Sequence, residues 1–129
     1  MTPEFLEHDA VLFVHGQAVR EYGGTHGLRD EGLLRAALAR PVNRLAYGNP
    51  APDLFDLAAA YAYGLARTHA FHDGNKRTAW ACCVLFLALN GIRLHVPAPD
   101  VVGQMVALVG GALDEAGFAG WLRGVRRLG

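Results

Sequence analysis

The chain has 129 residues, and its 52% hydrophobic and 19% charged content indicates one folded domain over residues 1–129 rather than a disordered chain. Twelve basic and twelve acidic residues cancel, so no overall field favours nucleic acid or an anionic membrane, and we expect neither as a partner. The longest apolar run, 79–89, is too short to span a bilayer, and no secretory signal is evident.

The first part of the chain predicts two helices. Residues 3–22 carry apolar side chains at helical spacing, and the glycine-rich stretch 23–27 must be a loop. Asp30 is a suitable N-cap for a second helix. We expect Pro41 to stop that helix, and 42–52 to form a loop with at most one helical turn.

The rest of the chain predicts four more helices. An Ala- and Leu-rich stretch, 53–68, precedes an almost unbroken apolar stretch, 75–90, and both have helical character. After a short extended segment over 92–96, two further helices are expected over 100–109 and 114–127, with Asp100 as a suitable N-cap for the first of them. No segment shows sustained alternation of apolar and polar residues. The predicted fold class is therefore all-α, with about six helices.

The two cysteines indicate the redox environment. Cys82 and Cys83 are adjacent within the apolar stretch and are poorly placed to pair with each other. We expect buried free thiols, as in a reducing cytoplasm. Serine is absent, which excludes every mechanism with a serine nucleophile.

Residues 69–79, HAFHDGNKRTA, are the only place where polar residues of different chemistry crowd between two apolar helices. We call this segment the motif. It holds a histidine, a carboxylate, an amide and two cations: His69, Asp73, Asn75, Lys76 and Arg77. Lys76 is the only lysine in the chain, whereas the other eleven basic residues are arginine. That usage suggests a specific role for its ammonium group.

The order of the motif residues predicts a phosphate site. Gly74 permits a tight turn, and Asp73 or Asn75 is a suitable N-cap for the following helix. The free amides of the first helical turn and the positive end of the helix dipole form an anion site. Lys76 and Arg77 add charge to it.

Two further residues suit phosphate chemistry at this site. Asp73 can hold the Mg²⁺ that accompanies nucleotide phosphates. His69 can take a proton from an attacking hydroxyl near neutral pH, because an unperturbed histidine has a pKa of about 6.5. The sequence therefore predicts His69 as a general base and Asp73 as a metal ligand.

Simpler interpretations exist for the same residues. His69 could cap the last carbonyls of the preceding helix, Asp73 could be a turn residue, and Asn75 could be an N-cap only. Arg67 could lie on the surface or reach the same phosphates. Arg77 is unfavourable beside the positive end of a helix dipole unless an anion binds there. In the glycine-rich loop, two side chains could touch substrate, namely His26 and Arg29.

The motif resembles the signature of the Fic/Doc superfamily, H-P-F-x-[D/E]-G-N-G-R, and in particular its death-on-curing (Doc) branch. Ala70 stands where proline is usual, and Lys76 replaces the second glycine. The continuation N-K-R-T-A is typical of the Doc branch. The resemblance extends outside the motif, through Tyr22-Gly23-Gly24 and Gly27-Leu28-Arg29-Asp30, over roughly 4–125.

This resemblance implies a helical bundle with the motif loop between two central helices. It also implies that ATP binds at Gly74, Asn75, Lys76 and Arg77. Most Fic relatives transfer AMP to a protein hydroxyl, whereas Doc-type proteins bind the nucleotide reversed and transfer the γ-phosphate. Lys76 in place of glycine favours the kinase. Elongation factor Tu is the implied target, and arrested translation is the implied outcome.

A partner is also implied. Fic enzymes are commonly restrained by a helix that reads [S/T]-x-x-x-E-[G/N], whose glutamate pairs with the motif arginine. The 129 residues contain no such sequence. The resemblance therefore implies a toxin restrained by a Phd-like antitoxin, which docks beside Arg77.

Three alternatives remain open from the sequence. The first is an AMP transferase of the Fic type. The second is an HD-type metal phosphohydrolase, because His72-Asp73 is an HD pair, with His26 and Asp100 as the only loose candidates for further ligands. The third is a non-catalytic interaction module whose loop binds an acidic segment of a partner.

Overall fold

Six helices and no strand make up the described part of the chain, residues 2–127, in a computed structural model of the protein. Their bounds are α1 His8–Tyr22, α2 Glu31–Tyr47, α3 Leu54–Arg67, α4 Asn75–Leu89, α5 Ala98–Gly110 and α6 Glu115–Gly124. The predicted all-α class with about six helices is confirmed. None of the helices in this part of the chain has the length and apolar character that a membrane span requires.

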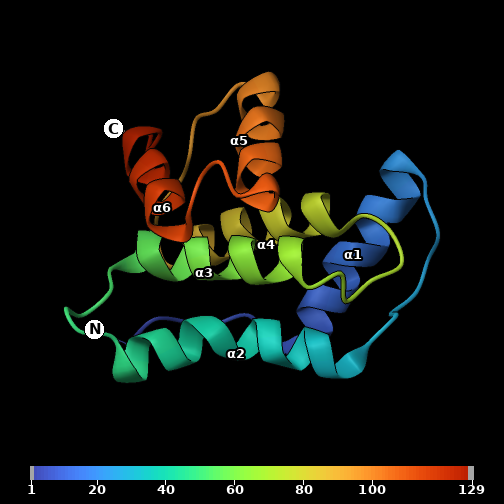
Figure 1. Cartoon of the computed structure of the whole chain (residues 1–129), viewed down its shortest axis with the longest axis horizontal. Coiled ribbons are helices and arrows are strands. Elements are labelled where there is room, and N and C mark those ends of the chain that lie inside the picture. Colours follow the sequence, from blue (N-terminus) through green and yellow to red (C-terminus); the bar gives the residue numbers. More distant parts are fainter. Residues whose placement is uncertain (1, 128–129) are drawn as a thin grey trace.

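The pair α3 and α4 forms the centre of the bundle (Figure 1). Helix α2 packs against α3 on one side, α5 and α6 lie on the other, and α1 packs against α4 at one end. Small side chains let α3 approach its neighbours closely, since a Cβ at Gly64 would lie 2.9 Å from Cδ of Arg40 on α2. As Figure 1 shows, the motif loop joins α3 to α4 at the end of the bundle where α1 lies.

Asp30 is the N-cap of α2 as predicted, and α3 and α6 begin beside Asp53 and Asp114, where the sequence places their starts. Asp30 accepts a hydrogen bond from the amide of Leu33 at the start of α2, and Asp114 accepts one from the amide of Gly117 in α6. Asp53 and Asp56 form a reciprocal capping box at the start of α3.

Helix α2 does not stop at Pro41, so that prediction is wrong. The helix continues to Tyr47, and Pro41 is buried inside it. Leu34, Ala37 and Pro41 form one buried stripe that faces α3. Burial of this continuous stripe offsets the one backbone hydrogen bond that proline cannot donate.

Two predicted helix starts are also wrong. Residues 3–7 are extended, not helical, because the amide of Leu6 donates to the hydroxyl of Tyr61 and the Leu6 side chain is buried against the core. Helix α5 begins at Ala98 with Pro97 at its N-cap, so Asp100 lies inside the first turn and caps nothing. A proline at the boundary fixes the backbone there before any side-chain cap is needed.

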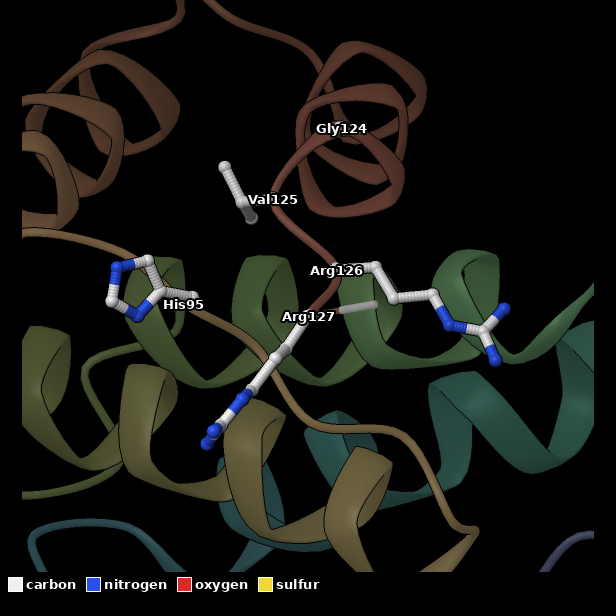
Figure 2. A pocket seen from close by; sticks show the side chains of 5 residues that line it. All are labelled: His95, Gly124, Val125, Arg126 and Arg127. Carbon is white, nitrogen blue, oxygen red and sulfur yellow. The ribbon is translucent and has the colours of Figure 1, made fainter. Parts of the chain in front are cut away.

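Helix α6 ends at Gly124 rather than at residue 127. The next residues pair with the predicted extended segment, through a single antiparallel bridge between Leu94 and Arg126. The arginines near this end do not form one basic patch. Arg123 is paired with Asp53 and Asp56, and Figure 2 shows Arg126 and Arg127 pointing in different directions.

The two thiols are free and buried in α4, as predicted. Burial raises the pKa of the Cys82 thiol to about 12 and raises the pKa of Cys83 as well. Because the thiolate is the nucleophile, we expect neither cysteine to react with iodoacetamide at pH 8 in the folded protein. Both should react after unfolding in guanidinium chloride, as counted by mass spectrometry. Alkylation of either thiol in the folded protein would contradict this arrangement.

Candidate active site

His69 begins the motif loop in a strained backbone conformation. Its φ is 51°, and no other non-glycine residue of the described part has a positive φ. Such a conformation costs about 1–2 kcal/mol and persists only where neighbouring groups hold it. The side chain is exposed, and its ring makes no hydrogen bond within residues 2–127. Both ring nitrogens are therefore accessible to a substrate.

Arg29 holds the backbone at this point. Its Nε donates to the carbonyl of His69 at 2.7 Å, and its Nη2 lies 3.5 Å from the carbonyl of Thr68. The amides of Arg29 and Asp30 both donate to the carbonyl of Ala70. The carbonyls of Thr68 and His69, just after α3, are thus occupied by a cation from a distant segment. Capping by His69, the simpler interpretation of that residue, is not what the structure shows.

The segment 23–30 runs along the motif loop and fixes its course. Leu28 and Phe71 form an antiparallel bridge, and the amide of His72 donates to the carbonyl of Gly27. Further along, Gly24 lies so close to Asp73 that an added Cβ would stand 3.1 Å from the Asp73 Cβ. The glycine-rich loop therefore holds the motif loop in place, although it lies far from the motif in the sequence.

Asp73 presents an exposed carboxylate next to this segment. Its Oδ2 accepts a hydrogen bond from the amide of Thr25 at 2.9 Å. No partner for its other carboxylate oxygen is present within residues 2–127. A carboxylate with one oxygen held and one available suits a cation that takes one protein ligand and several from phosphate and water, as Mg²⁺ does.

Gly74, not Asp73 or Asn75, is the N-cap of α4, so that prediction is wrong. Gly74 has a left-handed φ of 75°, and no side chain caps the helix. The amide of Thr78 makes the first helical bond, to the carbonyl of Gly74. The amides of Asn75, Lys76 and Arg77 precede it and are the unfilled donors of this helix end.

The side chain of Asn75 closes the motif loop instead of capping a helix. Its Oδ1 accepts from the amide of Phe71 at 3.1 Å, and its Nδ2 donates to the carbonyl of Phe71 at 3.0 Å. Both groups are buried, so each satisfies a donor or acceptor that would otherwise be left unpaired. Asn75 thus shapes the anion site through its side chain and contributes to it through its backbone amide.

Lys76 and Arg77 are exposed cations on the first turn of α4 and take part in no ion pair within the described residues. The guanidinium of Arg77 lies over the ring of Tyr22, 4.2 Å from its centroid. Contact with a ring face leaves the N–H donors of Arg77 available in their own plane. An anion at this helix end would therefore meet two unneutralised positive charges.

Tyr22 provides a direct test of that contact. The family resemblance implies that ATP binds at this helix end. On that expectation, Tyr22→Leu should weaken the binding of ATP by about 2–5-fold, because an exposed cation–π contact contributes about 0.5–1 kcal/mol. Tyr22→Phe keeps the ring and should bind ATP as the unaltered protein does. The two dissociation constants, measured by calorimetry, should differ. Equal values would mean that the ring does not position Arg77.

Arg67 lies apart from this group. Its Nη1 donates to the hydroxyl of Tyr63, and its side chain lines a hollow of about 410 Å³ with Arg40 and Glu115. A second hollow, of about 660 Å³, lies at the end of α6 beside His95 (Figure 2). Neither hollow is lined by motif residues. The contribution of Arg67 to phosphate binding stays a prediction.

Comparison with known proteins shows the family to which the chain belongs. A model of the Fic/DOC family matches residues 5–87. The chain is 49% identical over 126 residues to a protein of Mycolicibacterium smegmatis named Toxin Doc. The aligned region covers 90% of this chain and 94% of that protein. The chain belongs to the Fic/DOC family. It is also 33% identical over 118 residues, with 92% of each chain covered, to a protein of Escherichia phage P1 named Protein kinase doc.

Several residues that shape this Fic/DOC site lie outside the motif. The contacts of Thr25 and Arg29 come from the loop that follows α1, and Tyr22 and His15 of α1 contact motif residues as well. The run of glycines in this loop was the available signal, because it allows a backbone to approach another closely. His15 gave no signal, since it sits among apolar residues at helical spacing.

Proposed function

We propose that this Fic/DOC protein is a Doc-type toxin that transfers the γ-phosphate of ATP to a hydroxyl of another protein. One observation carries the proposal. A single loop presents an exposed histidine with accessible ring nitrogens at one end, and an unfilled helix N-terminus with two unpaired cations at the other. A base at one end of the loop and a site for a polyanion at the other suit the transfer of a phosphoryl group from a nucleotide to a hydroxyl.

The roles of the residues follow from their chemistry. His69 would remove the proton of the acceptor hydroxyl while the oxygen of that hydroxyl forms a bond to the γ-phosphorus. The bond from that phosphorus to the bridging oxygen would break, and ADP would leave. The amides of Asn75 to Arg77, with the charges of Lys76 and Arg77, would stabilise the phosphate oxygens. Gly74 makes the turn that directs these amides outward.

Mg²⁺ fits the residues present. Asp73 is the one exposed carboxylate of the motif, and within the described residues no group of three His, Cys, Asp or Glu side chains could hold a metal ion. A site with one carboxylate is what Mg²⁺ uses when phosphates supply the other ligands. When bound, Mg²⁺ would neutralise phosphate charge. The HD-type alternative gains no support from the structure, because it requires several protein ligands.

Two features favour phosphate transfer over AMP transfer. Lys76 stands at the position where AMP-transferring relatives have glycine, and its long side chain is exposed at the start of α4. It would fill space that the usual nucleotide pose needs and add charge near a reversed chain of phosphates. The relative from phage P1 is named a protein kinase. An AMP transferase is the second candidate, because the signature of AMP-transferring Fic proteins differs from the motif of this chain at few positions.

We further propose the target and the partner that the family resemblance implies. Elongation factor Tu would be the substrate, with arrested translation in the cytoplasm as the outcome. A Phd-like antitoxin would restrain the toxin by placing an acidic group near Arg77. Within residues 2–127 the guanidinium of Arg77 meets an aromatic ring and no carboxylate, which leaves that contact for another chain.

A labelling experiment tests the proposal. The protein is incubated with Mg²⁺, elongation factor Tu, and ATP labelled at either the α- or the γ-phosphate. Label should reach elongation factor Tu only from the γ-position, and the antitoxin should prevent it. Label from the α-position would show an AMP transferase. No label from either, in purified target and in whole-cell extract alike, would favour a non-catalytic interaction module.

A further inference from the structure

A buried histidine of α1 faces the motif loop. The side chain of His15 is only 4% exposed and lies on the same face of α1 as Val11 and Val19. A buried imidazole needs hydrogen-bond partners, because an unpaired one destabilises the fold. The hydrogen-bond partner of His15 is Asp73, a residue of the candidate active site.

Two contacts join His15 to the motif loop, and its ring lies beside a third residue of that loop. Its ring stacks on Phe71 with centroids 3.8 Å apart and planes within 9°. Its Nε2 lies 2.8 Å from the backbone carbonyl of Asp73. At Gly74, an added Cβ would stand 3.8 Å from the same nitrogen. One side chain therefore contacts the loop two residues before the carboxylate and at the carboxylate residue itself, and it lies beside the N-cap of α4.

The hydrogen bond has a defined direction. A carbonyl oxygen can only accept, so the Nε2 of His15 must carry the proton and donate it. The carbonyl of Asp73 is thus fixed by a side chain of α1, while its Oδ2 is fixed by the amide of Thr25 in the glycine-rich loop. Held at both its backbone and its side chain, Asp73 has little freedom to turn away from the anion site.

We propose that His15 is a positioning residue for Asp73 and for the amides at the start of α4. It neither touches substrate nor transfers a proton in the reaction. By contacting the short stretch from Phe71 to Gly74, His15 keeps the carboxylate of Asp73 at a fixed position relative to the phosphate-binding amides at the start of α4. This inference rests on the proposed function and deepens it.

Two variants separate the ring from the donor. In His15→Gln the side-chain amide can reach the position of Nε2 and donate, but the stacking on Phe71 is lost. In His15→Phe the stacking remains and the donor is lost. Val11→Ala is the matched control, because it removes buried volume from the same face of α1 one turn earlier. Thermal unfolding of all three shows how much each change destabilises the fold.

The measurement is the affinity for Mn²⁺ in the presence of ATP, followed by water-proton relaxation. His15→Phe should weaken Mn²⁺ binding by about 10-fold, the lower end of the loss seen when groups that orient metal ligands are removed. His15→Gln should stay within about threefold of the unaltered protein, and Val11→Ala should bind Mn²⁺ normally despite a lower melting temperature. Relative to the unaltered protein, amide hydrogen exchange in His15→Phe should increase more in the motif loop than in the rest of the chain.

The outcomes separate this inference from the proposed function. Normal Mn²⁺ binding by His15→Phe would overturn the positioning role and leave the proposed function standing. Equal loss in His15→Phe and Val11→Ala would also overturn it, since stability alone would then explain both. No binding of Mn²⁺ and ATP by the unaltered protein would contradict the proposed function, and the positioning role would fail with it.

Discussion

Replacing His69 by alanine should lower the rate of phosphoryl transfer by about 10²–10⁴-fold, the usual contribution of a positioned general base. The fold should be unaffected, because the ring is exposed and makes no hydrogen bond within residues 2–127. The rate constant at saturating ATP, measured with elongation factor Tu, is the quantity to compare. Binding of ATP should change little, since the phosphate donors lie at the other end of the loop.

Two further variants control for this change. His72→Ala removes another exposed histidine of the same loop, whose backbone amide keeps its bond to Gly27. It should retain the activity. His69→Gly should be as inactive as His69→Ala but more stable by about 1 kcal/mol, because glycine adopts a positive φ without strain. A His69→Ala variant with more than about a tenth of the normal rate would contradict the role of general base.

Replacing Asp73 by asparagine should reduce the activity at least about 100-fold and raise the Mg²⁺ concentration needed for half-maximal rate. The amide oxygen of asparagine can still accept the hydrogen bond from Thr25, so the loop should keep its course. What is lost is the negative charge that holds the cation. Titration of the rate with Mg²⁺ distinguishes this effect from a general loss of activity.

Asp100→Asn is the matched control for the loss of one carboxylate. Asp100 is exposed in the first turn of α5, and the same substitution there should leave the Mg²⁺ dependence unchanged. If Asp73→Asn and Asp100→Asn responded alike to Mg²⁺, Asp73 would not be the metal ligand. Nucleotide binding without Mg²⁺ should not weaken in Asp73→Asn, because a negative charge has been removed from beside the phosphates.

The helical class was predictable because its signals are local. Asp30 caps α2 as predicted, since an N-cap depends on residues within one turn, and α3 and α6 begin beside Asp53 and Asp114, where the sequence places their starts. The errors at Pro41 and Asp100 have different causes. Helix α2 continues through Pro41 because the buried face on which it lies continues, whereas α5 begins before Asp100 because Pro97 already fixes the backbone at the helix start.

The motif residues were identifiable from the sequence, but the contacts that shape the motif were not. His15, Thr25 and Arg29 bond to motif residues that are 58, 48 and 40 positions away along the chain. No periodicity links such positions. They meet only because α1 packs against α4 and its following loop returns along the motif. Likewise, the side chain of Asn75 bonds to Phe71, a detail set by the left-handed turn at Gly74.

The identity of the nucleotide released in a single turnover tests the central claim most directly. Protein in excess over ATP is mixed with Mg²⁺ and elongation factor Tu, and the products are separated by chromatography. The account predicts ADP in an amount equal to the modified elongation factor Tu, and none with His69→Ala. Pyrophosphate in place of ADP, with AMP on the target, would contradict transfer of the γ-phosphate.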